Sequence, residues 1–156
     1  MKDSIPEVMI RPATLDDKDQ IVNLLGFLPN QYPEADEWLE RRLTEAFNGN
    51  AYAFCLFHSG ELVGILLGIL KPNNKMKIST FYITPEHSGL GLGKILLAAG
   101  VATAILEKAS AVYLTANARL EKTLGGLLEN QGFKLIAAKP DLYIIGDTEN
   151  IYELTL

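Results

Sequence analysis

The segment with the clearest chemical potential is a glycine-rich stretch at residues 88–94, Ser-Gly-Leu-Gly-Leu-Gly-Lys. It follows a predicted strand and opens a long predicted helix. Glycines let the backbone approach an anion closely, and the first N–H groups of a helix have no partner inside it. The helix dipole also favours negative charge at this end. The segment, called the glycine loop below, therefore predicts a site for a pyrophosphate.

Two common phosphate-binding patterns do not fit the glycine loop. A dinucleotide-binding loop needs G-x-G-x-x-G, and the third glycine position falls here on Lys94 or Leu96. A Walker loop needs glycine where Ser88 stands and a hydroxyl residue where Ile95 stands. A glycine-rich turn that serves only close packing remains as a structural alternative.

The hydrophobic pattern around the glycine loop predicts alternating helices and strands, with proline, glycine and asparagine at the turns. The expected strands are 8–11, 52–58, 62–70, 77–84, 111–116, 134–138, 142–145 and 151–156, and the expected helices are 15–25, 35–47, 92–110 and 122–130. This order predicts a three-layer α/β fold with a mixed sheet, partly antiparallel and partly parallel, flanked by helices. We expect a single domain over residues 1–156, with a right-handed parallel crossover around the glycine loop.

The residues around the glycine loop resemble the acyl-CoA motif of the GNAT superfamily of N-acetyltransferases. Phe81-Tyr82-Ile83-Thr84-Pro85-Glu86 is similar to a family strand that ends in Val-x-Pro-Glu, and Gly132-Phe133 resembles a later family landmark at the usual spacing. The order of elements also matches, so the resemblance spans essentially the whole chain. It implies a GNAT-like fold with acetyl-CoA, or another acyl-CoA, as co-substrate.

The resemblance also implies which residues hold this co-substrate. Backbone N–H groups of the glycine loop would bind the pyrophosphate, and the strand edge before it would bind the pantetheine arm. The strand at 115–117 would splay away to leave the slot where thioester and amine meet. The implied residues are Phe81, Tyr82, Ile83, Ser88, Gly89, Leu90, Gly91, Leu92, Gly93, Lys94, Thr115 and Asn117. Ser88 replaces the usual arginine or glutamine, which removes a long side chain but no amide.

Catalysis needs a neutral amine and a proton for the leaving thiolate. A lysine-like amine is neutral about once in 10³ molecules at pH 7, so a base removes roughly 4 kcal/mol of barrier. Many family members use a glutamate and a tyrosine at positions that hold Lys77 and Leu128 here. We single out two residues that could take over their catalytic roles: Ser79, which shares a strand face with Lys77, and Tyr82. Further options are His87, Tyr113, Tyr143 and Tyr152, or proximity and thioester polarisation alone.

The function expected is transfer of an acetyl group from acetyl-CoA to a primary amine by direct attack in a ternary complex. One alternative is a catalytically degenerate acyl-CoA-binding or regulatory module, which the departures at Lys77 and Leu128 would allow. Another is an interaction domain that retains the fold and dimerises through its terminal strands. The identity of the amine-bearing acceptor stays open.

Composition limits the partners and the compartment. A formal net charge of -5 argues against nucleic-acid binding through bulk charge. The single cysteine, Cys55, excludes an internal disulfide and a cysteine-based metal cluster, and its alternating strand predicts a buried small side chain. The start of the chain lacks a signal-peptide pattern, and the apolar stretch at 62–70 is far shorter than the ~20 residues of a membrane span. We expect a cytoplasmic protein without a metal or a membrane partner.

Overall fold

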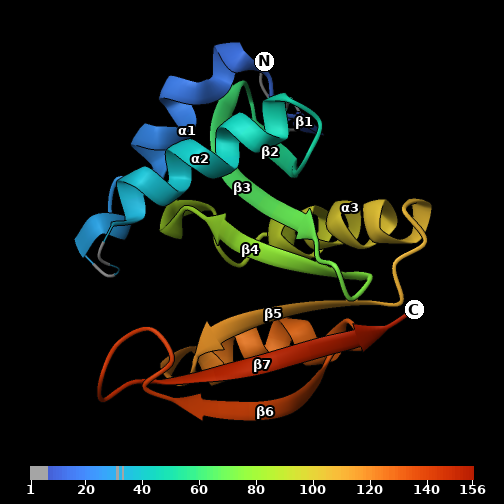
Figure 1. Ribbon diagram of the computed structural model, residues 1–156. Helices are drawn as coiled ribbons and strands as arrows, with labels where there is room; N and C mark the ends of the chain where they lie inside the picture. The colour runs from blue at the N-terminus through green and yellow to red at the C-terminus, as the bar shows by residue number, and fades with distance from the viewer. Residues whose placement is uncertain (1–6, 31, 33) are drawn as a thin grey trace. The chain divides into compact units, whose positions relative to one another are not determined.

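The computed structural model describes residues 7–30, 32 and 34–156, apart from the side chains of residues 120–122. The strands form a seven-stranded sheet in the order β1-β2-β3-β4-β5-β7-β6 (Figure 1). Their bounds are Val8–Pro12 (β1), Tyr52–His58 (β2), Glu61–Leu70 (β3), Lys75–Ile83 (β4), Ala111–Asn117 (β5), Lys134–Pro140 (β6) and Thr148–Thr155 (β7). β4 and β5 pair in parallel, whereas β1 with β2, β5 with β7 and β6 with β7 pair antiparallel. The predicted mixed sheet is confirmed.

The helices are Lys18–Leu24 (α1), Ala35–Phe47 (α2), Leu92–Leu106 (α3) and Gly126–Asn130 (α4). None of the helices in the described ranges is long and apolar enough to cross a bilayer. The chain divides into two compact units, one of Met1–Leu67 and Thr80–Ala99 and one of Gly68–Ser79 and Gly100–Leu156. That residues 1–156 act as one domain stays a prediction.

The first unit has a hydrophobic core between its two N-terminal helices and its strands. Ile21 and Leu25 from the α1 region and Leu39 and Leu43 from α2 pack with alternate residues of β2 and β3, among them the fully buried Cys55. Alternation places every second strand residue on the same face, which explains why Cys55 is buried as predicted. The partly buried Tyr82 of β4 packs against the same cluster.

A partly buried ion pair ties β1 to the turn before α1. The guanidinium of Arg11 donates two hydrogen bonds to the Asp17 carboxylate, at 2.7 and 2.9 Å, and lies 4.7 Å from the ring centre of Phe57. The Thr14 N–H and hydroxyl also donate to Asp17, at 2.7 and 3.1 Å. Asp17 thus satisfies the backbone N–H of Thr14 and neutralises Arg11 at the same time.

The second unit is built on β5, β7 and β6, with α4 on one side of these strands (the orange helix in Figure 1). Val112, Leu114 and Ala116 of β5 are buried on one face, together with Leu128 of α4 and Phe133. The opposite face carries Tyr113, Thr115 and Asn117, which are half-buried. Polar residues therefore collect on one face of this unit and apolar residues on the other.

Several expected elements differ from the structure. The helix expected at 122–130 opens as a π-helix, Glu121–Gly125, and only Gly126–Asn130 is α-helical. The predicted strand at 142–145 is wrong, because residues 141–146 form the turn between β6 and β7, with Asp141 at φ 59° and Gly146 at φ 93°. The continuous apolar run suggested a strand there, but a strand exists only with a pairing partner. α3 ends at Leu106 and not at residue 110. Lys108, two residues after this end, has a left-handed φ of 58°, which does not continue a helix. The first expected helix opens as a 3₁₀ turn, Leu15–Asp17.

Candidate active site

The glycine loop depends on two glycines in left-handed conformation. Gly89 has φ 80° and Gly91 has φ 79°, and a Cβ added at either would meet no atom within 4 Å. The requirement for glycine is therefore conformational and not a matter of space. Within the described chain, the N–H groups of residues 89–91 donate to no backbone carbonyl. Leu92 then starts α3 with its side chain buried, so its backbone alone faces the loop.

The loop is anchored at its first end by Thr84, which follows β4. The Thr84 N–H donates to the Val63 carbonyl on β3 at 2.9 Å. The Thr84 hydroxyl shares a hydrogen bond of 2.7 Å with His87 Nδ1, and Ser88 Oγ donates to the Thr84 carbonyl at 3.3 Å. The side chains of His87 and Ser88 therefore brace the turn, whereas Ser88 to Gly91 and Lys94 are exposed. Gly93 is half-buried.

The end of the strand before the loop packs against β3 at a position where only glycine fits, Gly64. A Cβ on Gly64 would lie 2.6 Å from Ile83 Cδ1, 3.2 Å from the Tyr82 carbonyl oxygen and 3.3 Å from Leu56 Cβ. The Tyr82 ring lies 4.7 Å from the Phe27 ring, centroid to centroid. Burial raises the pKa of the Tyr82 phenol, and the neighbouring Glu86 raises it further. Tyr82 therefore keeps its proton at neutral pH and cannot serve as a base.

In the second unit, Ser79 and Lys77 occupy one face of β4. Lys77 lies opposite Tyr113 in the parallel pair with β5, and Lys75 forms a 2.7 Å salt bridge with Glu153 of β7. The hydroxyl of Ser79 is buried without a hydrogen-bond partner, although the residue as a whole is half-buried. An unpartnered hydroxyl is costly and can accept or donate to an incoming group.

The carboxyl end of β5 carries a polar cluster of Asn117, Arg119, Asp147 and Glu149, here called the Asn117 cluster. Asn117 Nδ2 donates to Asp147 at 3.3 Å, and Asn117 Oδ1 accepts from both the backbone N–H and Nε of Arg119 at 3.0 Å. Glu149 lies directly opposite Asn117 and is only 4% exposed. Sequence reasoning did not select Glu149, because an acid in a terminal strand does not reveal its burial.

The other proposed proton carriers are placed less favourably. Tyr152 is buried and its hydroxyl has no partner, whereas Leu128 is a fully buried core residue without acid–base capacity. Burial raises the pKa of Tyr113, and Tyr143 and Glu153 add to this effect.

Burial also raises the pKa of the Cys55 thiol to about 12, which makes it inert as a nucleophile. Among the side chains described, no group of His, Cys, Asp or Glu is arranged to hold a metal ion.

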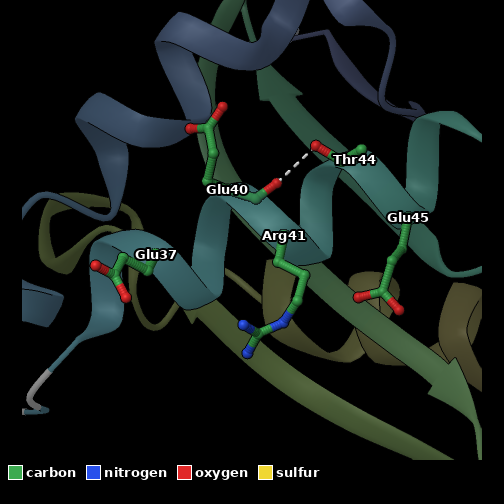
Figure 2. Close-up of a pocket in the computed structure, with 5 residues that line it drawn as sticks. All are labelled: Glu37, Glu40, Arg41, Thr44 and Glu45. Atoms are coloured by element: carbon green, nitrogen blue, oxygen red, sulfur yellow. Dashed lines mark hydrogen bonds between the residues drawn. The ribbon is translucent and has the colours of Figure 1, made fainter.

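A shallow open hollow of about 440 Å³ lies on the outer face of α2 (Figure 2). It is lined by Glu37, Glu40, Arg41, Thr44 and Glu45. The Thr44 hydroxyl donates to the Glu40 carbonyl within the helix, and the Glu40 carboxylate contacts Lys18. The hollow is therefore an acidic helix surface without a residue of the glycine loop.

Comparison with known proteins agrees with this geometry. The model of the acetyltransferase (GNAT) family matches residues 19–133, so the chain belongs to the GNAT acetyltransferase family. No curated protein gives a significant match.

The structure also resembles solved members of this family. The N-acetyltransferase from Staphylococcus aureus Mu50 has a TM-score of 0.80 at 17% identity, over 96% of this chain and 98% of that one. The ribosomal-protein-S18-alanine N-acetyltransferase from Escherichia coli has a TM-score of 0.80 at 14% identity, over 96% of this chain and 94% of that one. A GNAT acetyltransferase from Elizabethkingia anophelis with acetyl-CoA bound has a TM-score of 0.75 at 13% identity, over 96% of this chain and 98% of that one.

Family membership defines the enzyme class. The chain is an acyl-CoA N-acetyltransferase, and acetyl-CoA is its co-substrate. The left-handed glycines and open amides of the glycine loop could hold an anionic group such as a pyrophosphate.

Proposed function

We propose that the protein transfers the acetyl group of acetyl-CoA to a primary amine by direct attack in a ternary complex. The observation that carries the proposal is the glycine loop, whose amides at residues 89–91 are unused by the backbone and precede the N-terminus of α3. A preorganised row of N–H donors binds a polyanion without having to rearrange.

Each predicted co-substrate residue has a role that its environment supports. Gly89, Leu90, Gly91, Leu92 and Gly93 would offer backbone amides, and Lys94, which is exposed, would offer a positive charge. Ser88 would act through its amide, because its side chain bonds to Thr84. The half-buried Phe81, Tyr82 and Ile83 would present strand edge groups to the pantetheine arm, and Thr115 with Asn117 would border the thioester.

The acceptor is proposed only as an amine that arrives as an ammonium ion. The acidic side chains along α2 and the net charge of -5 support a cationic acceptor. One structural neighbour, the ribosomal-protein-S18-alanine N-acetyltransferase from Escherichia coli, is an example of an enzyme with an acceptor of this class. A homodimer and a cytoplasmic location stay predictions.

Calorimetric titration with acetyl-CoA tests the site. Wild-type protein should bind in the micromolar range, and Gly91→Glu should lose most of this affinity, because the variant adds strain and a negative charge where the pyrophosphate lies. Gly49→Glu is the matched control, since Gly49 also has a left-handed φ, 81°, and open surroundings but lies outside the loop. Equal loss in both variants would contradict the proposed cradle.

A transfer assay then separates the alternatives. Release of CoA in the presence of a panel of primary amines supports the enzyme mechanism proposed. Tight binding of acetyl-CoA without transfer to any amine would favour the catalytically degenerate module. A folded protein without affinity for acetyl-CoA would leave only the interaction domain.

A further inference from the structure

Glu149 is a buried carboxylate that has no role in the proposed function as described so far. It stands on β7 directly opposite Asn117, the last residue of β5, and only 4% of it is exposed. Residues directly opposite in an antiparallel pair point to the same face of a sheet. Glu149 therefore shares its face with Asn117 and Thr115, the two β5 residues predicted to border the thioester.

Glu149 has no cationic partner in the described part of the chain. The guanidinium of Arg119 lies 3.7 Å from Asp147 instead, and its side chain is 77% exposed. Lys139 of β6 lies opposite Glu149, but it is exposed and forms no ion pair with it. A buried carboxylate without a paired cation is unfavourable, because the hydration that it loses is only partly replaced. The missing cation is what an acceptor ammonium would supply.

The surroundings of Glu149 also suit proton transfer. Burial raises the pKa of its carboxyl, and the charge of Asp147 raises it further, whereas the hydrogen bond from Asn117 and the charge of Arg119 lower it. The balance is a raised pKa, which makes the carboxylate a stronger base than a solvated glutamate. Asn117 fixes the orientation of the cluster through its bonds to Asp147 and Arg119.

The residues at the usual positions cannot do this work. Lys77 carries a positive charge and lies opposite Tyr113, where it would repel an ammonium, and Leu128 is apolar and fully buried. The hydroxyl of Ser79 cannot act as the base on its own, because its alkoxide does not form near neutral pH. On the polar face of the second unit, the other acid of β7, Glu153, is already paired with Lys75.

We propose that Glu149 is the general base of the acetyl transfer, an inference that rests on the proposed function. The Glu149 carboxylate takes one proton from the acceptor ammonium and leaves a neutral amine. The amine nitrogen then forms a bond to the acetyl carbon while the carbon–sulfur bond to CoA breaks. The second nitrogen proton goes to the CoA thiolate, so the products are the amide, CoA thiol and protonated Glu149, which releases its proton to water.

The test compares Glu149→Gln with Glu153→Gln as a matched control on the same strand and face. Transfer is measured as CoA thiol release with n-butylamine, spermidine, phenethylamine and a peptide with a free N-terminal alanine as acceptors. Glu149→Gln should lower kcat about 10²-fold at pH 7, within the range for loss of a general base. Its affinity for acetyl-CoA, measured by calorimetry, should stay within about twofold, and Glu153→Gln should keep most of the activity.

The pH dependence separates a base from a merely structural residue. In Glu149→Gln only the amine that is already neutral reacts, so its rate should rise about tenfold per pH unit up to the pKa of the acceptor. The wild-type rate should level off at much lower pH. A constant loss at every pH, activity close to wild type, or a parallel loss of acetyl-CoA affinity would each overturn the proposal.

An NMR titration tests the pairing without turnover. The side-chain carboxyl signal of Glu149, assigned by its absence in Glu149→Gln, should titrate at lower pH when n-butylammonium is added in excess, because the cation favours the carboxylate. No shift with n-butylammonium would overturn the role of Glu149. A wild-type protein that shows this shift and binds acetyl-CoA, yet acetylates no amine of the panel, would refute the proposed function instead.

Discussion

At the scale of single residues, burial and the charged partner together decide the acid–base character of a side chain in this protein. Cys55 and Glu149 are both buried, yet one becomes inert and the other is a candidate base, because a thiol loses reactivity when its thiolate is disfavoured and a carboxylate gains basicity. Asp17 is equally buried but has the opposite shift, since Arg11 binds its carboxylate directly. The partner, and not burial alone, sets the direction.

Asp17 should make the first unit sensitive to acid. The hydrogen bonds from Arg11, and then those from Thr14, lower the pKa of the carboxyl from 3.8 to about 2. A lowered pKa stabilises the folded state above the unfolded value, and this stability is lost as the pH falls from about 4 to 2. Because Arg11 is partly solvated, we expect about 1–2 kcal/mol.

Urea unfolding as a function of pH measures this contribution. Asp17→Asn should be less stable than wild type at pH 7 and should lack the loss of stability below pH 4. Asp16→Asn, in the same turn, serves as the control and should follow the wild-type profile. Identical acid profiles for wild type and Asp17→Asn would refute the role of the ion pair.

Cys55 should not react with thiol reagents in the folded protein. Its side chain is fully buried and its pKa is about 12, so thiolate and access are both lacking. Reaction with a chromogenic disulfide should appear only after denaturation, whereas an added Thr44→Cys on the exposed face of α2 should react at once. Rapid modification of native wild-type protein would contradict the buried placement of Cys55. The same property permits thiol detection of released CoA.

At the scale of elements, the position of β4 depends on a glycine in the neighbouring strand. Gly64 lets β3 approach the backbone of Tyr82 and the side chain of Ile83, two residues predicted to face the pantetheine arm. β4 is followed directly by Thr84, which braces the glycine loop through His87 and Ser88. The packing of β3 and the shape of the loop are therefore linked by one short segment.

Gly64→Ala should destabilise the protein by about 1–3 kcal/mol, the usual cost of overpacking a close contact. Ile83 can move its terminal methyl group, but the Tyr82 carbonyl and Leu56 Cβ belong to fixed parts of the strands. Gly126→Ala is the control, because Gly126 lies in α4 with open space around it and should tolerate or favour alanine. Urea unfolding measures both variants, and a neutral Gly64→Ala would show that the strands can separate freely.

At the scale of the whole molecule, binding of the co-substrate should add to folding stability. A ligand that binds only the folded state stabilises it by about 2.7 kcal/mol at a concentration of about 100 times its Kd. For a chain of this length, that corresponds to a rise in Tm of about 5–10 °C. Differential scanning fluorimetry with acetyl-CoA should show this rise in wild type and in Gly49→Glu but not in Gly91→Glu. An equal rise in all three would place the ligand outside the glycine loop.

Local structure could be predicted from the sequence alone. The glycine loop, the order of strands and helices, and the parallel pairing around α3 all follow from short-range patterns of glycine, proline and apolar residues. The burial of Cys55 was predictable in the same way, because alternation along one strand assigns its face.

Tertiary structure decided the features that join distant residues. The apolar run at 142–145 is consistent with a buried strand, but no strand in the described part of the chain pairs with it, and it forms a turn. Glu149 meets Asn117, Lys75 meets Glu153 and Gly64 meets Ile83 only after strands far apart in sequence are paired. Burial and pairing depend on those non-local contacts, so a general base built on them carries no local sequence signal.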